Sequence, residues 1–233
     1  MDSLPPESQN TDKMIAMLDR LSLIGEEQLS KGNLRKAKTA FEYTLKKSRL
    51  DNNYNYIESS LVNLAATSLA DDKPEQALSY LQSALELDVE NNKTGDIRFN
   101  MALAHEQLGC DSEAVREYEL AITAYQLQNA SPDVMVRTCV KSGILLMKLR
   151  KYKKSTQYLD MAATILSEKE LVEQLATVLC MKAKCLVTSD KTVTEAIDEC
   201  DECIKLCSSI NSWDIHTGWL LYPCTIGTCS DCR

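Results

Sequence analysis

The sequence predicts an all-α protein: a right-handed α-solenoid of about five helix–turn–helix repeats, followed by an irregular C-terminal tail. Two patterns support this prediction. Apolar residues recur at helical spacing along most of the 233 residues, and pairs of small residues recur with a period near 40. The pairs are Gly25 and Ala37, Ala65 and Ala77, Ala102 and Ala114, Gly143 and Ser155, and Ala183 and Ala196. Small residues let two antiparallel helices approach closely, so each pair predicts one helix crossing.

The N-terminal part of the chain already shows this alternation of helix and turn. Residues 1–12 are polar and include two adjacent prolines, which predicts disorder. From Met14 onward, apolar residues keep a spacing of three and four, and Gly32 lies in the break before a second helix. Pro74 follows a polar run and suits the first turn of a helix, where its missing N–H costs no hydrogen bond.

Later breaks complete a set of ten expected helices. Gly109 separates the fifth helix from the sixth, and Ser131 with Pro132 is typical of a capped helix start. The expected helices cover about residues 14–30, 34–50, 56–70, 74–87, 97–108, 114–127, 134–149, 153–167, 171–187 and 193–207. They group into repeats at about 13–50, 55–90, 94–128, 132–168 and 171–207. No alternation typical of strands is present in the sequence.

Composition limits the functional classes. The formal net charge of -8 argues against a nucleic-acid grip over the whole surface. No apolar run reaches membrane-spanning length, and the N-terminus lacks the order of a signal peptide, so a cytoplasmic protein is expected. In that compartment the ten cysteines would be mostly reduced thiols.

The helix pairs resemble tetratricopeptide repeats. In the third repeat, the residues that fit the family pattern are Ala102, His105, Leu108, Gly109, Ala114, Tyr118 and Ala121. The first repeat has Gly25, Gly32, Ala37 and Phe41 at matching positions, although Thr44 replaces the last small residue. The resemblance covers about residues 14–207 and implies a non-catalytic adaptor or scaffold that binds a peptide or helical segment of a partner protein.

The repeats are longer than the usual 34 residues, which resembles the extended repeats of kinesin light chains and the LGN adaptors. In those groups an asparagine of the first helix binds the backbone of a bound peptide. The matching residues here are Asn63 and Asn100, whereas other residues hold this place in the remaining repeats. The segment 99–104 is also similar to the tetratricopeptide-repeat-24 group, which implies no defined chemistry.

Projecting the repeat onto the first helices gives a candidate partner-binding groove. Its predicted members are Asn63, Phe99, Asn100, Leu103, Arg137, Val140, Lys141 and Lys148. The groove would run from acidic through apolar to basic, so a bound peptide's own charge gradient could fix its direction. The alternative interpretation is that these are ordinary solvated helix faces.

Two other functional classes remain open. A helical-repeat RNA-binding protein is opposed by the acidic net charge. A small zinc or redox protein would use two Cys-x-x-Cys pairs, Cys200 with Cys203 and Cys229 with Cys232, although the first pair falls on expected helix-packing positions. No catalytic or phosphate-binding motif is present, so no enzyme activity, cofactor or metal is expected.

Residues 208–233 differ from the repeats because they contain both tryptophans and three cysteines. They do not resemble a polar capping helix, which the end of a solenoid normally needs. We therefore expect imperfect cover of the last repeat and self-association through the C-terminal end.

Overall fold

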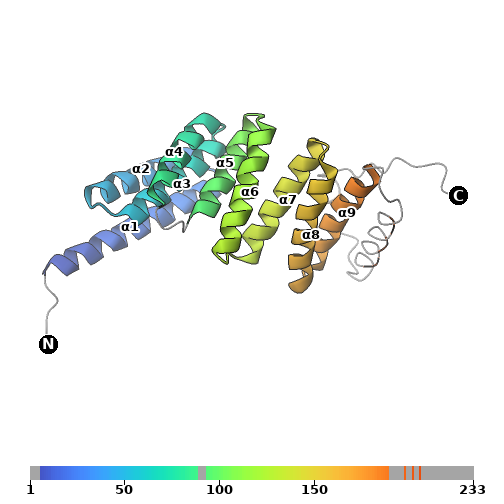
Figure 1. Ribbon diagram of the computed structural model, residues 1–233. Coiled ribbons are helices and arrows are strands. Elements are labelled where there is room, and N and C mark those ends of the chain that lie inside the picture. The colour runs from blue at the N-terminus through green and yellow to red at the C-terminus, as the bar shows by residue number, and fades with distance from the viewer. Residues whose placement is uncertain (1–5, 89–92, 189–196, 198–200, 202–204, 206–233) are drawn as a thin grey trace. The chain divides into compact units, whose positions relative to one another are not determined.

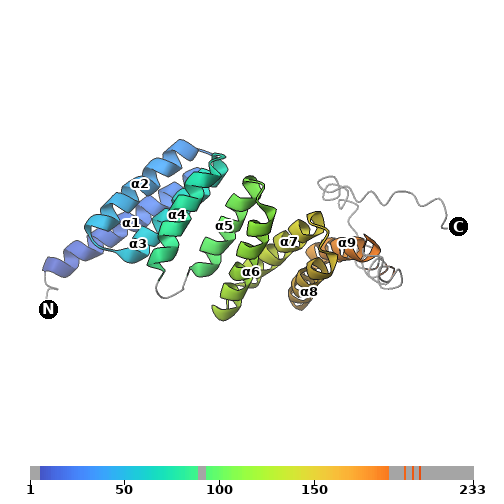
Figure 2. The ribbon, with the colours of Figure 1, turned by 45° about the horizontal axis from the view of Figure 1, so that its top comes forward.

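The computed structural model describes residues 6–88 and 93–188, together with residues 197, 201 and 205; side chains are described from residue 12 onward. These residues form α-helices and no strand, which confirms the predicted all-α class (Figures 1 and 2). The helices are α1 (Pro6–Ser30), α2 (Leu34–Leu50), α3 (Tyr54–Ala70), α4 (Pro74–Leu87), α5 (Thr94–Gln107), α6 (Asp111–Leu127), α7 (Pro132–Lys148), α8 (Tyr152–Glu168) and α9 (Val172–Thr188). Of the expected tenth helix, 193–207, only residues 197, 201 and 205 are described, and these three are helical. The tail 208–233, with its expected self-association, lies outside the described residues.

The sequence placed the C-terminal ends of the helices better than their starts. α1 begins at Pro6, within the segment 1–12 that the sequence predicts to be disordered. α5 and α6 each begin three residues earlier than the apolar pattern predicted. Acidic residues in the first turns, Asp96 in α5 and Asp111 with Glu113 in α6, interact favourably with the helix dipole without adding to an apolar stripe.

The chain forms two compact units, one ending at Lys151 and one beginning at Tyr152. In the first unit, each helix packs on the next as far as α7. The first helices of successive repeats also touch, α1 against α3 and α3 against α5. In the second unit, α8 packs against α9, with the Ser155 hydroxyl 3.3 Å from Cys185 Sγ and Lys182 Nζ 2.7 Å from Asp160 Oδ1.

The predicted small residues lie at the centres of the helix crossings. Ala37, Ala65, Ala77, Ala102 and Ala114 are all fully buried. Their burial explains the spacing seen in the sequence, because a larger side chain at these places would separate the backbones.

Gly25 shows the same principle without any side chain. The ring of Phe41, itself fully buried, lies where a Cβ on Gly25 would be. The glycine therefore lets α2 place an aromatic ring directly against the backbone of α1.

One turn geometry joins the helices throughout the described residues, except between α4 and α5. The second residue after the helix end is left-handed, with φ between 48° and 74°, and the next amide donates to the carbonyl five residues earlier at 2.8–3.0 Å. This is the Schellman arrangement, which satisfies carbonyls at a helix end. The left-handed residues are Gly32, Asn52, Asp72, Gly109, Asn129, Arg150 and Glu170.

Candidate protein-binding face of the first helices

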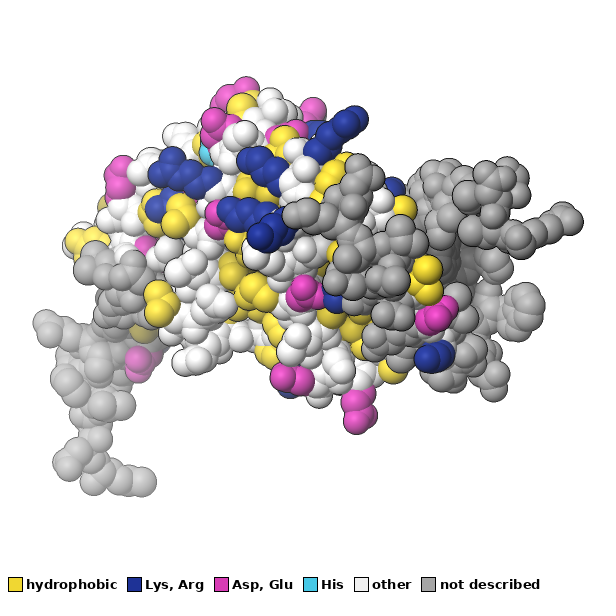
Figure 3. All heavy atoms as spheres, turned by 45° about the vertical axis from the view of Figure 1, so that its right-hand side comes forward, with side chains coloured by type: hydrophobic (Ala, Val, Ile, Leu, Met, Phe, Trp, Pro, Cys, Tyr) yellow, Lys and Arg dark blue, Asp and Glu magenta, His cyan; other side chains and the backbone are white. Residues whose placement is uncertain are grey.

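The candidate site is the face formed by the first helices of the first unit, α1, α3, α5 and α7, and is called the first-helix face below. All eight residues predicted for the groove lie on α3, α5 or α7. α6 follows α5 and precedes α7 in the sequence and contacts both helices, so it supports this face. Within the view of Figure 3, Lys and Arg side chains gather in the upper part of the surface, next to exposed apolar side chains.

Arg137 of α7 lies over Phe99 of α5 on this face. The guanidinium carbon of Arg137 lies 4.7 Å from the centroid of the Phe99 ring, a cation–π arrangement. Phe99 is 7% exposed, so it supports Arg137 rather than offering its own surface. Its ring also packs on Tyr118 with centroids 5.6 Å apart and planes tilted by 58°. Arg137 is exposed and forms no ion pair with any residue in the described part of the chain.

Two tyrosines of α6 bind two acids of α5 across the helical hairpin. Tyr118 donates its hydroxyl hydrogen to Glu106 Oε1 at 2.5 Å, and Tyr125 donates to Asp96 Oδ1 at 2.7 Å. Burial raises the pKa of both phenols well above the ordinary value, and the neighbouring carboxylates raise it further while Arg137 opposes the shift. Both phenols therefore stay protonated and keep donating at any ordinary pH.

The other two basic residues predicted for the groove are already paired. Lys141 Nζ lies 3.5 Å from Glu106 Oε2, and Lys148 Nζ lies 2.7 Å from Asp111 Oδ2. The basic end expected from the sequence is thus largely neutralised by acids of α5 and α6. Of the three predicted cations, Arg137 is the one whose charge is not satisfied within the described residues.

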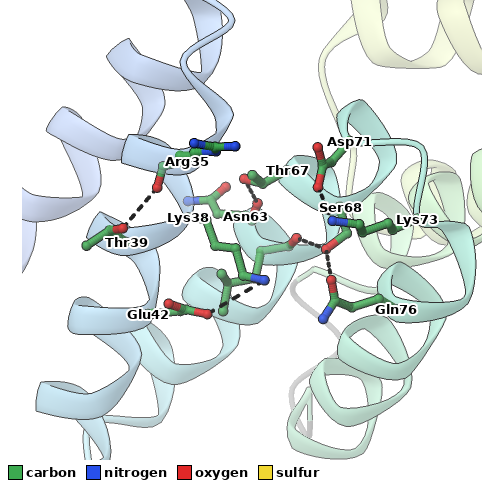
Figure 4. Close-up of polar contacts among 11 residues, drawn as sticks. Arg35, Lys38, Thr39, Glu42, Asn63, Thr67, Ser68, Asp71, Lys73 and Gln76 are labelled. Carbon is green, nitrogen blue, oxygen red and sulfur yellow. Dashed lines mark hydrogen bonds and ion pairs between the residues drawn. The ribbon is translucent and has the colours of Figure 1, made fainter.

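The two asparagines differ in their surroundings. Asn100 donates its side-chain amide to the carbonyl of Asp96 at 2.9 Å, which leaves its side-chain oxygen to accept. The half-buried side chain of Asn63 forms no hydrogen bond with another described residue, while its backbone carbonyl accepts from Thr67 at 2.8 Å (Figure 4). Leu103 and Val140 are half-buried on α5 and α7. Both asparagines thus keep hydrogen-bonding capacity.

The sequence did not predict the tyrosine–acid pairs. The repeat pattern predicted only a packing role for Tyr118 and no role for Tyr125. The available signal was the order of residues along the hairpin: the outer acid Asp96 faces the outer tyrosine, and the inner acid Glu106 faces the inner one. Antiparallel helices pair residues in this nested order.

The zinc and redox alternatives require clustered metal ligands or accessible thiols; among the described cysteines, Cys110 is exposed, whereas Cys139 and Cys185 are buried. No group of three or more His, Cys, Asp or Glu side chains that could hold a metal ion is present among those residues. Cys139 is fully buried, and burial raises the pKa of its thiol to about 12. The cysteine pairs at 200 and 203 and at 229 and 232 lie outside the described residues, so the zinc alternative is not tested.

None of the described helices has both the length and the apolar character that crossing a bilayer requires.

Comparison with known proteins identifies the fold. No protein-family model and no curated protein sequence matches the chain. The structure is similar to that of BtubC (BKLC) from P. vanneervenii, with a TM-score of 0.73 at 14% identity, covering 88% of this chain and 85% of that chain. It is also similar to a putative kinesin light chain with nearly identical TPR-like repeats from Podosopora anserina, with a TM-score of 0.66 at 12% identity, covering 83% and 96%. A Rap protein complexed with competence and sporulation factor gives 0.58 at 14%, covering 82% and 54%.

Proposed function

Because the chain has the helical-repeat fold of tetratricopeptide-repeat proteins, we propose that it is a non-catalytic adaptor that binds a peptide or helical segment of a partner protein on the first-helix face. The observation that carries the proposal is the position of Arg137. It is exposed, held over Phe99, and unpaired among the described residues, so it is ready to receive an acidic side chain or backbone carbonyls of a partner.

The surroundings of Arg137 favour such a contact. The tyrosine–acid pairs fix α6 against α5, so the platform beneath Arg137 is rigid before binding and little ordering remains to be done. Asn100 lies one residue after Phe99, with its side-chain oxygen free of the bond that its amide makes. Arg137 and Asn100 would together bind a side chain and the backbone of the partner. The Rap protein solved in complex with competence and sporulation factor is a structural neighbour with a bound ligand, which agrees with the proposal.

The experiment compares affinity capture by the wild type, Arg137→Ala and the double variant Asn63→Ala with Asn100→Ala. Lys13→Ala, which removes an exposed cation of α1, serves as the control. We expect a true partner's binding to weaken about tenfold with Arg137→Ala, the usual loss for one well-placed charged hydrogen bond, and to be unchanged with the control. Hydrogen exchange should then show protection of α5 and α7.

Binding that survives all these changes, with no protection of α5 or α7, would place the partner elsewhere and overturn the proposal. Thermal melts of each variant separate lost contacts from lost folding. An RNA that binds more tightly than any protein, with an affinity that falls steeply with salt, would favour the RNA-binding alternative. The cytoplasmic location expected from the sequence stays a prediction.

A further inference from the structure

The second helix, α2, is strongly basic in an acidic protein. It carries six basic residues and one acidic residue, Glu42, whereas the whole chain has a formal net charge of -8. The basic residues are Arg35, Lys36, Lys38, Lys46, Lys47 and Arg49, and we call them the α2 basic ridge. The ridge does not belong to the first-helix face, because α2 is the second helix of its repeat.

Most of these charges are not neutralised by any residue that the structure describes. Lys38 Nζ lies 3.9 Å from Glu42 Oε1 (Figure 4). Lys47 Nζ lies over the Tyr43 ring, 5.4 Å from its centroid. The four remaining cations, Arg35, Lys36, Lys46 and Arg49, are exposed and form no ion pair with a described residue.

The field of the ridge reaches beyond α2. Asp71, in the turn between α3 and α4, has a pKa lowered chiefly by Lys73, with further contributions from Lys38 and Arg35. The surface around the N-terminal half of α2 therefore favours negative charge.

Shallow apolar grooves flank the ridge on both sides. One, of about 440 Å³, lies between α1 and α2, with Leu21, Ala40 and Tyr43 in its lining and Arg35 and Lys36 at its edge. The second, of about 490 Å³, lies between α2, α3 and α4.

The lining of the second groove repeats this combination. The apolar lining residues are Leu45, Leu50, Leu64 and Tyr80, and the charged ones are the cations Lys46 and Arg49 and the acid Glu42, which leaves this groove with a net positive lining. Apolar depressions bordered by unpaired cations suit a partner with the opposite pattern of charge.

We infer that the α2 basic ridge and its two grooves form a second docking surface, whose partner is an acidic amphipathic helix of another protein. Apolar side chains of that helix would enter one groove, and its carboxylates would reach the cations at the edge. Charge complementarity would steer the encounter and set the orientation of the helix. The surface would let the protein bind two partners at once, one here and one on the first-helix face.

A protein helix fits this surface better than RNA or a membrane. Ala40, Leu45 and Leu64 are buried in the walls of the depressions, and of the apolar lining residues Tyr43 and Leu50 are the two that are exposed. Binding to a bilayer requires a continuous row of projecting apolar side chains, which two residues do not provide. A long polyanion would extend past α2 toward the remaining surface, and the chain as a whole is acidic. A short acidic helix matches the ridge without meeting that repulsion.

The test uses a designed 17-residue peptide, equal in length to α2, with leucines at helical spacing on one face and glutamates on the other. The probes for comparison are a scrambled peptide of the same composition, a single-stranded RNA, and vesicles of phosphatidylcholine with phosphatidylserine. Binding to the full chain is measured by fluorescence anisotropy, or by sedimentation for the vesicles, over a salt series.

The ridge variant is Lys46→Glu with Arg49→Glu. The matched control is Lys13→Glu with Arg116→Glu, two exposed cations on α1 and α6 whose reversal changes the net charge equally. We expect the ridge variant to weaken peptide binding about tenfold or more, as rim charges turn repulsive, and the control to change it little. If charge reversal impairs folding, Lys46→Gln with Arg49→Gln replaces it, and the salt dependence of the wild type provides an independent measurement.

Binding of the amphipathic peptide that exceeds that of the scrambled peptide and depends on the ridge supports the inference. Equal binding of both peptides, equal loss in both charge variants, no peptide binding, or preferential binding of RNA or vesicles each overturns it. Arg137→Ala should leave this binding unchanged, so failure here is distinguishable from failure of the proposed function.

Discussion

Tyr118 donates its hydroxyl hydrogen to Glu106 across the α5–α6 hairpin at 2.5 Å, and the same carboxylate group accepts Lys141 of α7 at 3.5 Å. One acid thereby links three helices beneath the proposed binding face. Tyr118 is fully buried, so this phenol has no water to replace its partner.

Removing this hydroxyl should therefore lower the stability of the first unit. We expect Tyr118→Phe to lower the free energy of unfolding by about 1.5 kcal/mol, the usual value for a hydrogen bond to a charged group. Urea unfolding measures the change. Tyr43→Phe, which alters an exposed tyrosine, is the matched control and should have almost no effect. Equal stability of Tyr118→Phe and the wild type would show that the bond contributes nothing net.

The helix crossing at Ala102 offers a second test. Ala102 is fully buried, so Ala102→Leu should overpack the crossing and destabilise the protein by about 1–3 kcal/mol. Ala16→Leu places the same side chain at an exposed position of α1 and should change the melt little. An unchanged melting curve for Ala102→Leu would remove this alanine from the packing role assigned to it.

The contact between Gly25 and Phe41 predicts a coupled effect. A Cβ on residue 25 would overlap the buried Phe41 ring, so Gly25→Ala should cost about 1–3 kcal/mol despite the better helix propensity of alanine. Phe41→Leu also destabilises by itself, because it removes buried volume. The double variant should cost less than the sum of the two single variants, because the shorter side chain relieves the overlap. Strict additivity in a double-mutant cycle would contradict the proposed clash.

Glu58 of α3 should make stability depend on pH. Its side chain is buried, and burial raises the pKa of its carboxyl above the ordinary 4.5. Lys93, whose Nζ lies 3.6 Å from Glu58 Oε2, opposes this shift, and Asp88 adds to it. The folded state thus binds this proton more tightly than the unfolded state does. The resulting stabilisation is present below pH 4.5 and is lost as the pH rises through the higher folded pKa.

Glu58→Gln removes this titration. We expect the stability of the variant, relative to the wild type, to improve as the pH rises above 4.5, because the wild type then loses the stabilisation from its bound proton. Glu75→Gln, at an exposed position of α4, should show no such trend. Parallel pH profiles for the wild type and Glu58→Gln would mean that Lys93 fully compensates the burial of the carboxyl.

The sequence predicted the helices well wherever a residue type has a single structural role. Ala37, Ala102 and Pro74 belong to this class: the alanines are fully buried, and the proline stands at the start of α4. Ser131 precedes α7 as expected, but its side chain makes no capping hydrogen bond. Helix starts were placed less accurately because the first turn of a helix needs no apolar side chain.

The candidate site was only partly predictable, for a different physical reason. Helical projection places Arg137, Lys141 and Lys148 on one face, yet it does not tell which cations meet an acid from a neighbouring helix. Those pairings depend on side-chain reach across helices, since Lys148 and Asp111 are 37 residues apart in sequence. The burial of Phe99 beneath Arg137 likewise required the three-dimensional arrangement.

The shared turn geometry has a consequence for rebuilding this chain. The turn within a repeat, as at Gly32, and the turn between repeats, as at Asn52, present the same helix ending to the helix that follows. A segment cut out between two such turns therefore has the same helix ending on both sides. Such a segment can begin with either the first or the second helix of a repeat. Arg150 and Glu170 adopt the left-handed conformation although they are not glycines. Substituting glycine at these two positions should therefore reduce backbone strain in the turns of shortened or extended arrays.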